Sequence, residues 1–171
     1  MSRKRLWVLG SALAALAAVG CGLGDNGLSG SLDEVFPLDV SSVAVLRNDQ
    51  AFVVQYQAND NNDIDLVLRF TFALDDLPNF KAGNSYNLAG FTDAGVERAS
   101  FVHNAAGEPA RVLPAVSIGQ FNLDTGGNPG DVTAGSFSAS FVADGSYGSG
   151  RAVTGTFHAV ALDGGYGDWT P

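Results

Sequence analysis

The sequence predicts an all-β domain, an antiparallel β-sandwich of about eight strands, with a small β-barrel as the alternative. Apolar residues recur at every second position through residues 52–56, 64–74, 137–141 and 153–159, which places them on one face of a strand. Clusters of Gly, Asn, Asp and Pro separate these runs and mark turns. No segment carries the 3.6-residue periodicity of an amphipathic helix over twelve residues, so we expect little helix.

The first twenty residues have the pattern of a secretory signal peptide. Arg3, Lys4 and Arg5 form a basic start, and residues 6–19 are uncharged and rich in Leu, Ala and Val. This apolar run is shorter than the roughly 20 residues that a transmembrane helix needs, but it fits the apolar middle of a signal peptide. We therefore expect residues 1–20 to be removed on export.

The end of this segment, Ala18-Val19-Gly20-Cys21, resembles the lipobox of bacterial lipoproteins. In that family the cysteine is diacylated and becomes the new N-terminus, so the resemblance implies lipidation of Cys21 and a membrane anchor. Ala18 replaces the Leu that the family usually has, which leaves ordinary signal cleavage as the alternative. Cys21 is the only cysteine of the chain, and acylation would account for an unpaired thiol in an exported protein. Gly22 after the cysteine resembles lipoproteins that are sorted to the outer membrane.

Residues 21–31 read CGLGDNGLSGS, a Gly- and Ser-rich composition that we interpret as a flexible tether. Within it, residues 22–27 match the dinucleotide-binding pattern G-x-G-x-x-G. A signal peptide precedes them and no helical pattern follows, so we expect no nucleotide and no other cofactor. Residues 32–171 then form a single β domain, a length that suits one hydrophobic core.

Alternation and turn chemistry place the strands within this domain. Asn and Asp clusters at residues 48–49 and 59–63 mark hairpin tips, because both residue types tolerate left-handed backbone conformations. The closing pair GSFSASFV and VTGTFHAVAL resembles the terminal hairpins of uncharacterised lipid-anchored or secreted bacterial β-domains, which implies a fold type and no activity. Strands are expected near residues 42–47, 51–58, 63–74, 85–90, 97–103, 111–123, 135–143 and 151–162.

Removal of the first twenty residues would leave a strongly acidic chain. Three of the nine basic residues and none of the 18 acidic ones precede Cys21, so the mature chain would carry six basic and 18 acidic residues, a formal charge of −12. Nucleic acid repels such a domain, and the mature sequence has no basic cluster to overcome the repulsion. We therefore exclude nucleic acid as a partner.

The sequence offers few groups for catalysis, and we expect no catalytic residue. His103 lies at a predicted strand end and His158 on the polar side of an alternating run, so we interpret both as surface residues. Residues 145–150 lack the G-x-S-x-G spacing of a nucleophile elbow. Among 18 acidic residues some carboxylate pair is always close, so a carboxylate-based hydrolase is kept as the last of three hypotheses.

Three carboxylates in one loop are the candidates for a metal site. Asp60, Asp63 and Asp65 could supply oxygen ligands to calcium. Their spacing fails the EF-hand pattern, and a polar hairpin tip accounts for them without a metal. We therefore expect no bound metal and keep these three residues as the calcium candidates.

Three aromatic residues are the candidates for ligand binding. Tyr147, Tyr166 and Trp169 lie in Gly-rich polar segments rather than in alternating strands. Rings in such segments can form platforms for a sugar or a protein, although covering an edge of the core is the simpler role. We expect a non-catalytic, lipid-anchored domain of the cell envelope that binds a protein partner or takes part in envelope assembly. A carbohydrate-binding module that uses these rings is the second hypothesis.

The resemblance to lipoproteins makes a direct prediction. Cys21→Ala removes the sulfur that would carry the diacylglycerol, so the protein should move from the membrane fraction to the soluble fraction on cell fractionation. One acyl chain binds membranes marginally whereas two or more bind durably, so the change should be nearly complete. A Cys21→Ala protein that stays with the membrane would contradict the lipid anchor.

Overall fold

The computed structural model describes residues 26–60, 63–105 and 107–165, and within these ranges it has ten β-strands and one short 3-10 helix. The all-β prediction is therefore confirmed. The helix is η1 (Ser31–Glu34), and the strands are β1 (Gly27–Ser29), β2 (Ser42–Arg47), β3 (Ala51–Asp60), β4 (Asp63–Ala73), β5 (Asn84–Asn87), β6 (Ala99–Asn104), β7 (Arg111–Val112), β8 (Val116–Thr125), β9 (Val132–Phe141) and β10 (Ala152–Asp163).

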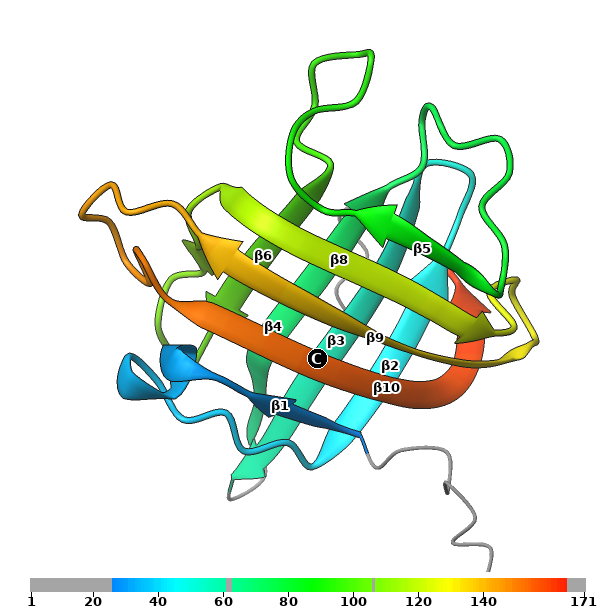
Figure 1. Cartoon of the computed structure of the whole chain (residues 1–171). Helices are drawn as coiled ribbons and strands as arrows, with labels where there is room; N and C mark the ends of the chain where they lie inside the picture. The colour runs from blue at the N-terminus through cyan, green and yellow to red at the C-terminus, as the bar shows by residue number, and fades with distance from the viewer. Residues whose placement is uncertain (1–25, 61–62, 106, 166–171) are drawn as a thin grey trace, which may run out of the picture.

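The strands form one sheet that curls over on itself into a half-barrel. The strand order is β5-β8-β9-β10-β2-β3-β4-β6-β7, and β1 pairs with β10 outside this path. Figure 1 shows two crossing layers, with β1, β5, β8, β9 and β10 in front and β2, β3, β4 and β6 behind. This shape lies between the sandwich and the barrel. The sequence left both open, because the alternation within single strands does not specify how a sheet closes.

Strand β10 joins the two layers. From Ala152 to Val160 it pairs with β9 in an antiparallel ladder, and from Ala161 to Asp163 it pairs with β2 in parallel. On the side that faces away from β9, its residues 154–156 pair with β1. Strand β10 therefore shares hydrogen bonds with three strands, and the first described strand lies beside the last.

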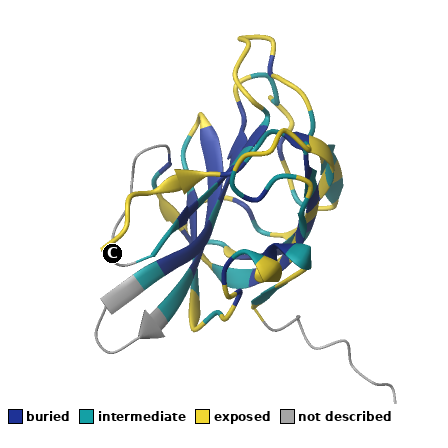
Figure 2. Ribbon diagram, turned by 90° about the vertical axis from the view of Figure 1, so that its left-hand side faces the viewer, coloured by how far each residue is buried: buried dark blue, intermediate teal, exposed yellow. Residues whose placement is uncertain are grey.

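Phenylalanine fills the space between the layers. The ring centroids of Phe70 in the back layer and Phe137 in the front layer lie 4.8 Å apart, within the range in which aromatic pairs attract. Figure 2 shows the buried residues in dark blue along the strands that face the interior. Seven phenylalanines from the two layers are at most 2% exposed: Phe52, Phe70, Phe72, Phe101, Phe121, Phe137 and Phe157. The alternating residues are thus the core, as predicted.

The outer face of β2 and β3 is not the solvated surface that alternation predicts. Gln55 on this face is 1% exposed. Arg69 of β4 donates from Nη2 to the carbonyl oxygen of Gly165 at 2.9 Å, which brings the chain after β10 onto the same face. Alternation gives the period of a strand but does not show whether both faces are covered. Three residues form a second, small buried cluster here: Leu46, Ala51 and Val53.

Two predicted segments have a different structure. Gly27–Ser29 is a strand and not part of a tether, because its backbone pairs with β10 and the Asn26 side chain accepts a hydrogen bond from the His158 backbone N–H at 2.6 Å. Its Gly- and Ser-rich composition predicted flexibility, but strand pairing orders it. The strand predicted over residues 111–123 is split into β7 and β8, since Pro114 cannot donate to a ladder.

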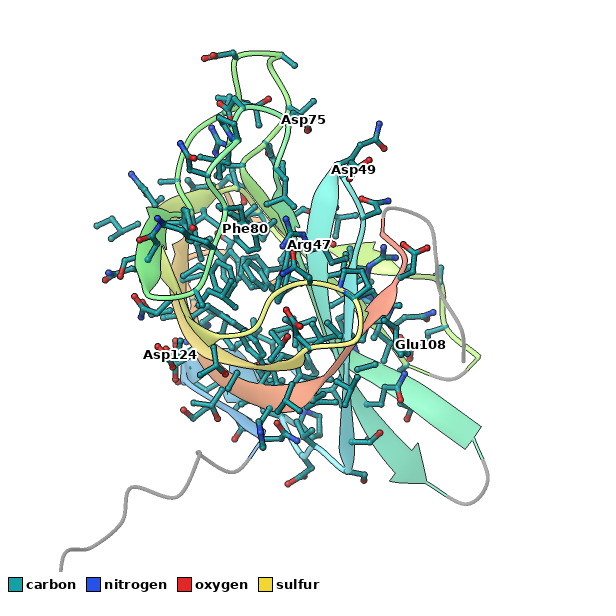
Figure 3. The ribbon with its side chains drawn as sticks, turned by 90° about the vertical axis from the view of Figure 1, so that its right-hand side faces the viewer. Arg47, Asp49, Asp75, Phe80, Glu108 and Asp124 are labelled. Carbon is teal, nitrogen blue, oxygen red and sulfur yellow. The ribbon has the colours of Figure 1, made fainter. Side chains whose placement is uncertain are left out.

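Arg47 links the two layers at one end of the interior. Its Nη1 donates to the carbonyl oxygen of Gly127 at 2.6 Å and to Oδ1 of Asn128 at 3.0 Å, both in the β8–β9 turn. Its guanidinium carbon also lies 5.0 Å from the centroid of the Phe80 ring, a cation–π distance. Figure 3 shows the Arg47 and Phe80 side chains next to each other. A single side chain therefore ties β2 to a turn of the opposite layer.

Gly155 of β10 provides a test of the packing between the layers. A Cβ atom at this position would lie 2.5 Å from the Phe137 ring and 2.8 Å from the Tyr56 hydroxyl. Gly155→Ala should therefore lower the free energy of unfolding by about 1–3 kcal/mol through overpacking. Gly27→Ala is the matched control, because nothing lies within 4 Å of a Cβ there. Urea unfolding followed by circular dichroism measures both variants, and equal losses would contradict this packing.

Candidate ligand-binding cleft

A cleft of about 530 Å³ opens at the end of the half-barrel that lies away from Arg47. Four segments that are far apart in the sequence form it: the chain after η1, the β3–β4 hairpin, the end of β6 with the loop to β7, and the β9–β10 loop. This volume is typical of sites for small ligands. The lining residues include Phe36, Asp65, His103, Glu108, Arg111 and Tyr147.

Three aromatic rings cluster in the cleft. The Phe36 and His103 rings stack with their centroids 3.9 Å apart and their planes 16° from parallel. The Tyr147 centroid lies 5.9 Å from that of Phe36 and 6.2 Å from that of His103, so the three rings form a triangle rather than a column. Helix η1 positions Phe36, whose backbone N–H donates to the carbonyl oxygen of the fully buried Leu32 at 3.3 Å.

His103 is buried, so its interpretation as a surface residue was wrong. The residue is 9% exposed, and its Nδ1 lies 2.9 Å from the carbonyl oxygen of Val67. A carbonyl oxygen only accepts, so Nδ1 is the protonated nitrogen, and in the neutral ring Nε2 is left as an acceptor. Phe36 covers the ring from a loop some 67 positions earlier in the chain, which no local pattern around His103 could indicate.

Polar groups of both charges surround the ring cluster. The guanidinium carbon of Arg111 lies 4.8 Å from the Tyr147 centroid, and its Nη2 donates to Oε2 of Glu108 at 3.2 Å. Burial raises the pKa of the Tyr147 hydroxyl, and the positive charge of Arg111 partly opposes this rise. The hydroxyl is therefore a protonated donor at neutral pH. The carboxylates of Asp39, Asp65 and Glu108 add acceptors to the lining.

Of the three predicted aromatic residues, the structure describes Tyr147. It is half-buried and lines the cleft, but Arg111 and Phe36 contact its ring, so it is not a free platform. Tyr166 and Trp169 lie outside the described residues, as does Cys21. The contribution of Tyr147 to a site is therefore shared with neighbours that the sequence did not indicate.

Of the three calcium candidates, Asp65 lines the cleft. The hairpin predicted around them is present, since β3 ends at Asp60 and β4 begins at Asp63. The side chains of Asp60 and Asp63 lie outside those that the structure describes. Within the described ranges, no group of three or more His, Cys, Asp or Glu side chains could hold a metal ion.

The lining residues that the sequence analysis missed include Phe36 and Arg111. Phe36 lies in an irregular segment and Arg111 in the two-residue strand β7, both too short for alternation to mark a residue as inward or outward. Pro37 after Phe36 was the one local signal, because a residue before proline is held extended and can present its side chain to a neighbouring element.

A second depression, of about 670 Å³, lies on the outer face of β5, β8, β9 and β10. It is shallow, and its lining holds no charged side chain and one ring, that of Tyr86. Tyr86 packs against the core and its hydroxyl bonds the backbone of Lys81, so it is already engaged. The cleft around His103 is therefore the better candidate for a ligand.

No protein-family model, curated protein or solved structure matches this chain. In the part of the chain that the structure describes, no helix has the length and apolar character needed to cross a membrane. The cleft and the sequence pattern of the N-terminus are therefore the basis for assigning a function.

His103→Ala tests whether the ring cluster stabilises the walls of the cleft. The variant loses the hydrogen bond to Val67 and the stacking on Phe36, so the free energy of unfolding should fall by about 2 kcal/mol. His158→Ala is the matched control, because its hydrogen bonds to Asn26 use the backbone. Urea unfolding at pH 7.5 compares the two, and an equal loss in both variants would show that the cluster contributes nothing specific.

Proposed function

We propose that the protein is a non-catalytic, lipid-anchored domain of the cell envelope that binds a carbohydrate in this cleft, with the outer membrane as its favoured location. The observation that carries the proposal is the half-buried Tyr147 ring, which lies on the buried Phe36 and His103 rings and beside polar groups of both charges. Rings contact the C–H surfaces of sugars, and carboxylates, guanidinium and hydroxyl groups exchange hydrogen bonds with sugar hydroxyls. A cleft of about 530 Å³ also suits a ligand of one to a few sugar rings.

A protein partner that adds a strand to the sheet is less well supported. Partners of this kind need a long free edge on which to form main-chain hydrogen bonds. The strands at the borders of the sheet are short: β5 has four residues, β1 has three and β7 has two.

A hydrolase is also less well supported. Glycoside hydrolysis needs one carboxyl group in an apolar environment that keeps it protonated at neutral pH. Asp39 and Glu108 are exposed and Asp65 is half-buried, so these cleft carboxylates suit hydrogen bonding to a ligand better than proton transfer.

The lipid anchor is supported by the sequence around Cys21. The described fold begins at Asn26, whose side chain already bonds to β10. Five residues span at most about 18 Å when fully extended. An acyl group on Cys21 would therefore hold the domain close to the membrane surface.

Substitutions in the cleft test the proposed ligand class. The full chain, purified in detergent, is screened against an array of neutral oligosaccharides that includes chito- and cello-oligosaccharides, and the best ligand is titrated by calorimetry. Tyr147→Ala and Arg111→Ala should each raise Kd about tenfold or more, because they remove a ring contact and a charged hydrogen-bond donor.

Arg151→Ala is the matched control for this experiment. Arg151 pairs with Glu34 at 2.5 Å and has a side-chain exposure of 38%, close to the 46% of Arg111, but it does not line the cleft. The Arg151→Ala variant should bind the oligosaccharide with the same affinity as the wild type. A protein that binds no oligosaccharide, or whose affinity is unchanged in Tyr147→Ala, would rule out the carbohydrate proposal.

A further inference from the structure

Three exposed aliphatic side chains form a patch on the outer face of β9 and β10. Val132, Val160 and Leu162 are 57%, 51% and 55% exposed. Val132 and Val160 are direct partners in the antiparallel ladder. Leu162 lies two residues beyond Val160 and therefore points to the same face of β10. These three residues are called the aliphatic patch below.

The aliphatic patch lies where the N-terminal segment joins the domain. Strand β1 runs antiparallel to β10 with Gly27 opposite Thr156, so the chain enters β1 from the end of β10 that carries Val160. The Asn26 side chain bonds to the backbone N–H and carbonyl of His158, at 2.6 and 3.4 Å. At about 3.3 Å per residue, His158 and Val160 are roughly 7 Å apart along the strand.

We propose that the aliphatic patch rests on the membrane in which the acylated Cys21 is inserted. This inference rests on the proposed lipid anchor. The five residues from Cys21 to Asn26 span at most about 18 Å, so the attachment point beside the patch stays near the bilayer. Tethering makes the local concentration of membrane high, and three aliphatic side chains then suffice for a contact that they could not maintain alone.

Charge around the patch defines the membrane surface that it fits. Asp131 precedes Val132, and Asp163 follows Leu162. Carboxylates are repelled by anionic headgroups. The patch should therefore contact a zwitterionic surface in preference to an anionic one.

A second copy of the chain is a weaker candidate for covering the patch. A stable protein–protein interface involves about 20–30 residues on each side. Three aliphatic residues between two aspartates are far fewer, whereas a membrane contact that is already tethered needs no such area.

Docking of the patch would also orient the cleft. Val132 of the patch is the first residue of β9 and Phe141 is the last. The β9–β10 loop, which contains Tyr147, follows Phe141. The nine-residue step from Val132 to Phe141 corresponds to about 30 Å along the strand. With the patch on the membrane, the cleft would face away from it and be accessible to a soluble or surface-bound glycan.

Depth-dependent fluorescence quenching tests this docking. The acylated protein has no free thiol, so Val160→Cys and Ile118→Cys each provide one labelling site for an environment-sensitive fluorophore. Ile118 is the matched control, because it is 76% exposed on the same layer and pairs with Ser140, eight residues from Val132 along β9. Each labelled protein is reconstituted into phosphatidylcholine vesicles that contain spin-labelled lipid.

The label at residue 160 should be quenched at least about twofold more than the label at residue 118, and adding phosphatidylglycerol should reduce the difference. Leu162→Cys provides an independent second site in the patch. Equal quenching at the patch and at residue 118 would overturn the proposal. A patch label that is shielded without lipid quenching, together with concentration-dependent crosslinking between copies, would assign the patch to a dimer and overturn it as well.

Failure of the anchor is distinguishable from failure of the docking. Mass spectrometry of the same sample shows whether Cys21 carries the acyl groups. An unmodified Cys21 in a protein that does not float with the vesicles would remove both the anchor and the docking. A modified Cys21 with equal quenching would remove the docking alone.

Discussion

The structure depends on one strand that belongs to both layers. Strand β10 pairs with β9 and β1 and then with β2, so backbone hydrogen bonds run from the front layer into the back layer without a break. Side chains strengthen this corner: the Tyr56 hydroxyl donates to the carbonyl oxygen of Thr156 at 3.1 Å. Burial raises the pKa of this hydroxyl, so it stays a donor. Strand β10 thus joins the two layers, and the phenylalanine rings fill the space between them.

The same strand determines where the cleft forms. Because β9 and β10 are paired along most of their length, the loop between them must turn above the end of the core. Gly148 permits this turn with a φ of +77°, and a Cβ there would lie 3.3 Å from both Leu32 and Leu113. Tyr147 is thereby held beside Phe36 and His103. The walls of the cleft are loops and strand ends, and the apolar contacts below them fix the positions of the loops.

The features that depend on neighbouring residues, such as burial within a strand and the position of a turn, were predicted from the sequence. Alternation predicted that Leu68 and Phe70 are buried, and the Asn- and Asp-rich cluster predicted the β3–β4 hairpin. It could not predict the parallel pairing of β2 with β10, because nothing local specifies which strands of a sheet become neighbours. For the same reason it placed His103 on the surface. Of the predicted site residues, Tyr147 and Asp65 line the cleft. The cleft as a whole was not predicted, since a site assembled from four segments leaves no signature in any one of them.

The contact between the first and last strands has a consequence for how the protein matures. Ser29 and Thr154 are 125 positions apart, and β10 completes both layers, so no stable core can form until the C-terminal part of the chain is available. An exported chain would therefore stay unfolded, and able to pass through a translocation channel, until almost all of it has been translocated. During that interval the edges of β2 and β9 would be open, and we expect chaperones to bind the chain before its final strand arrives.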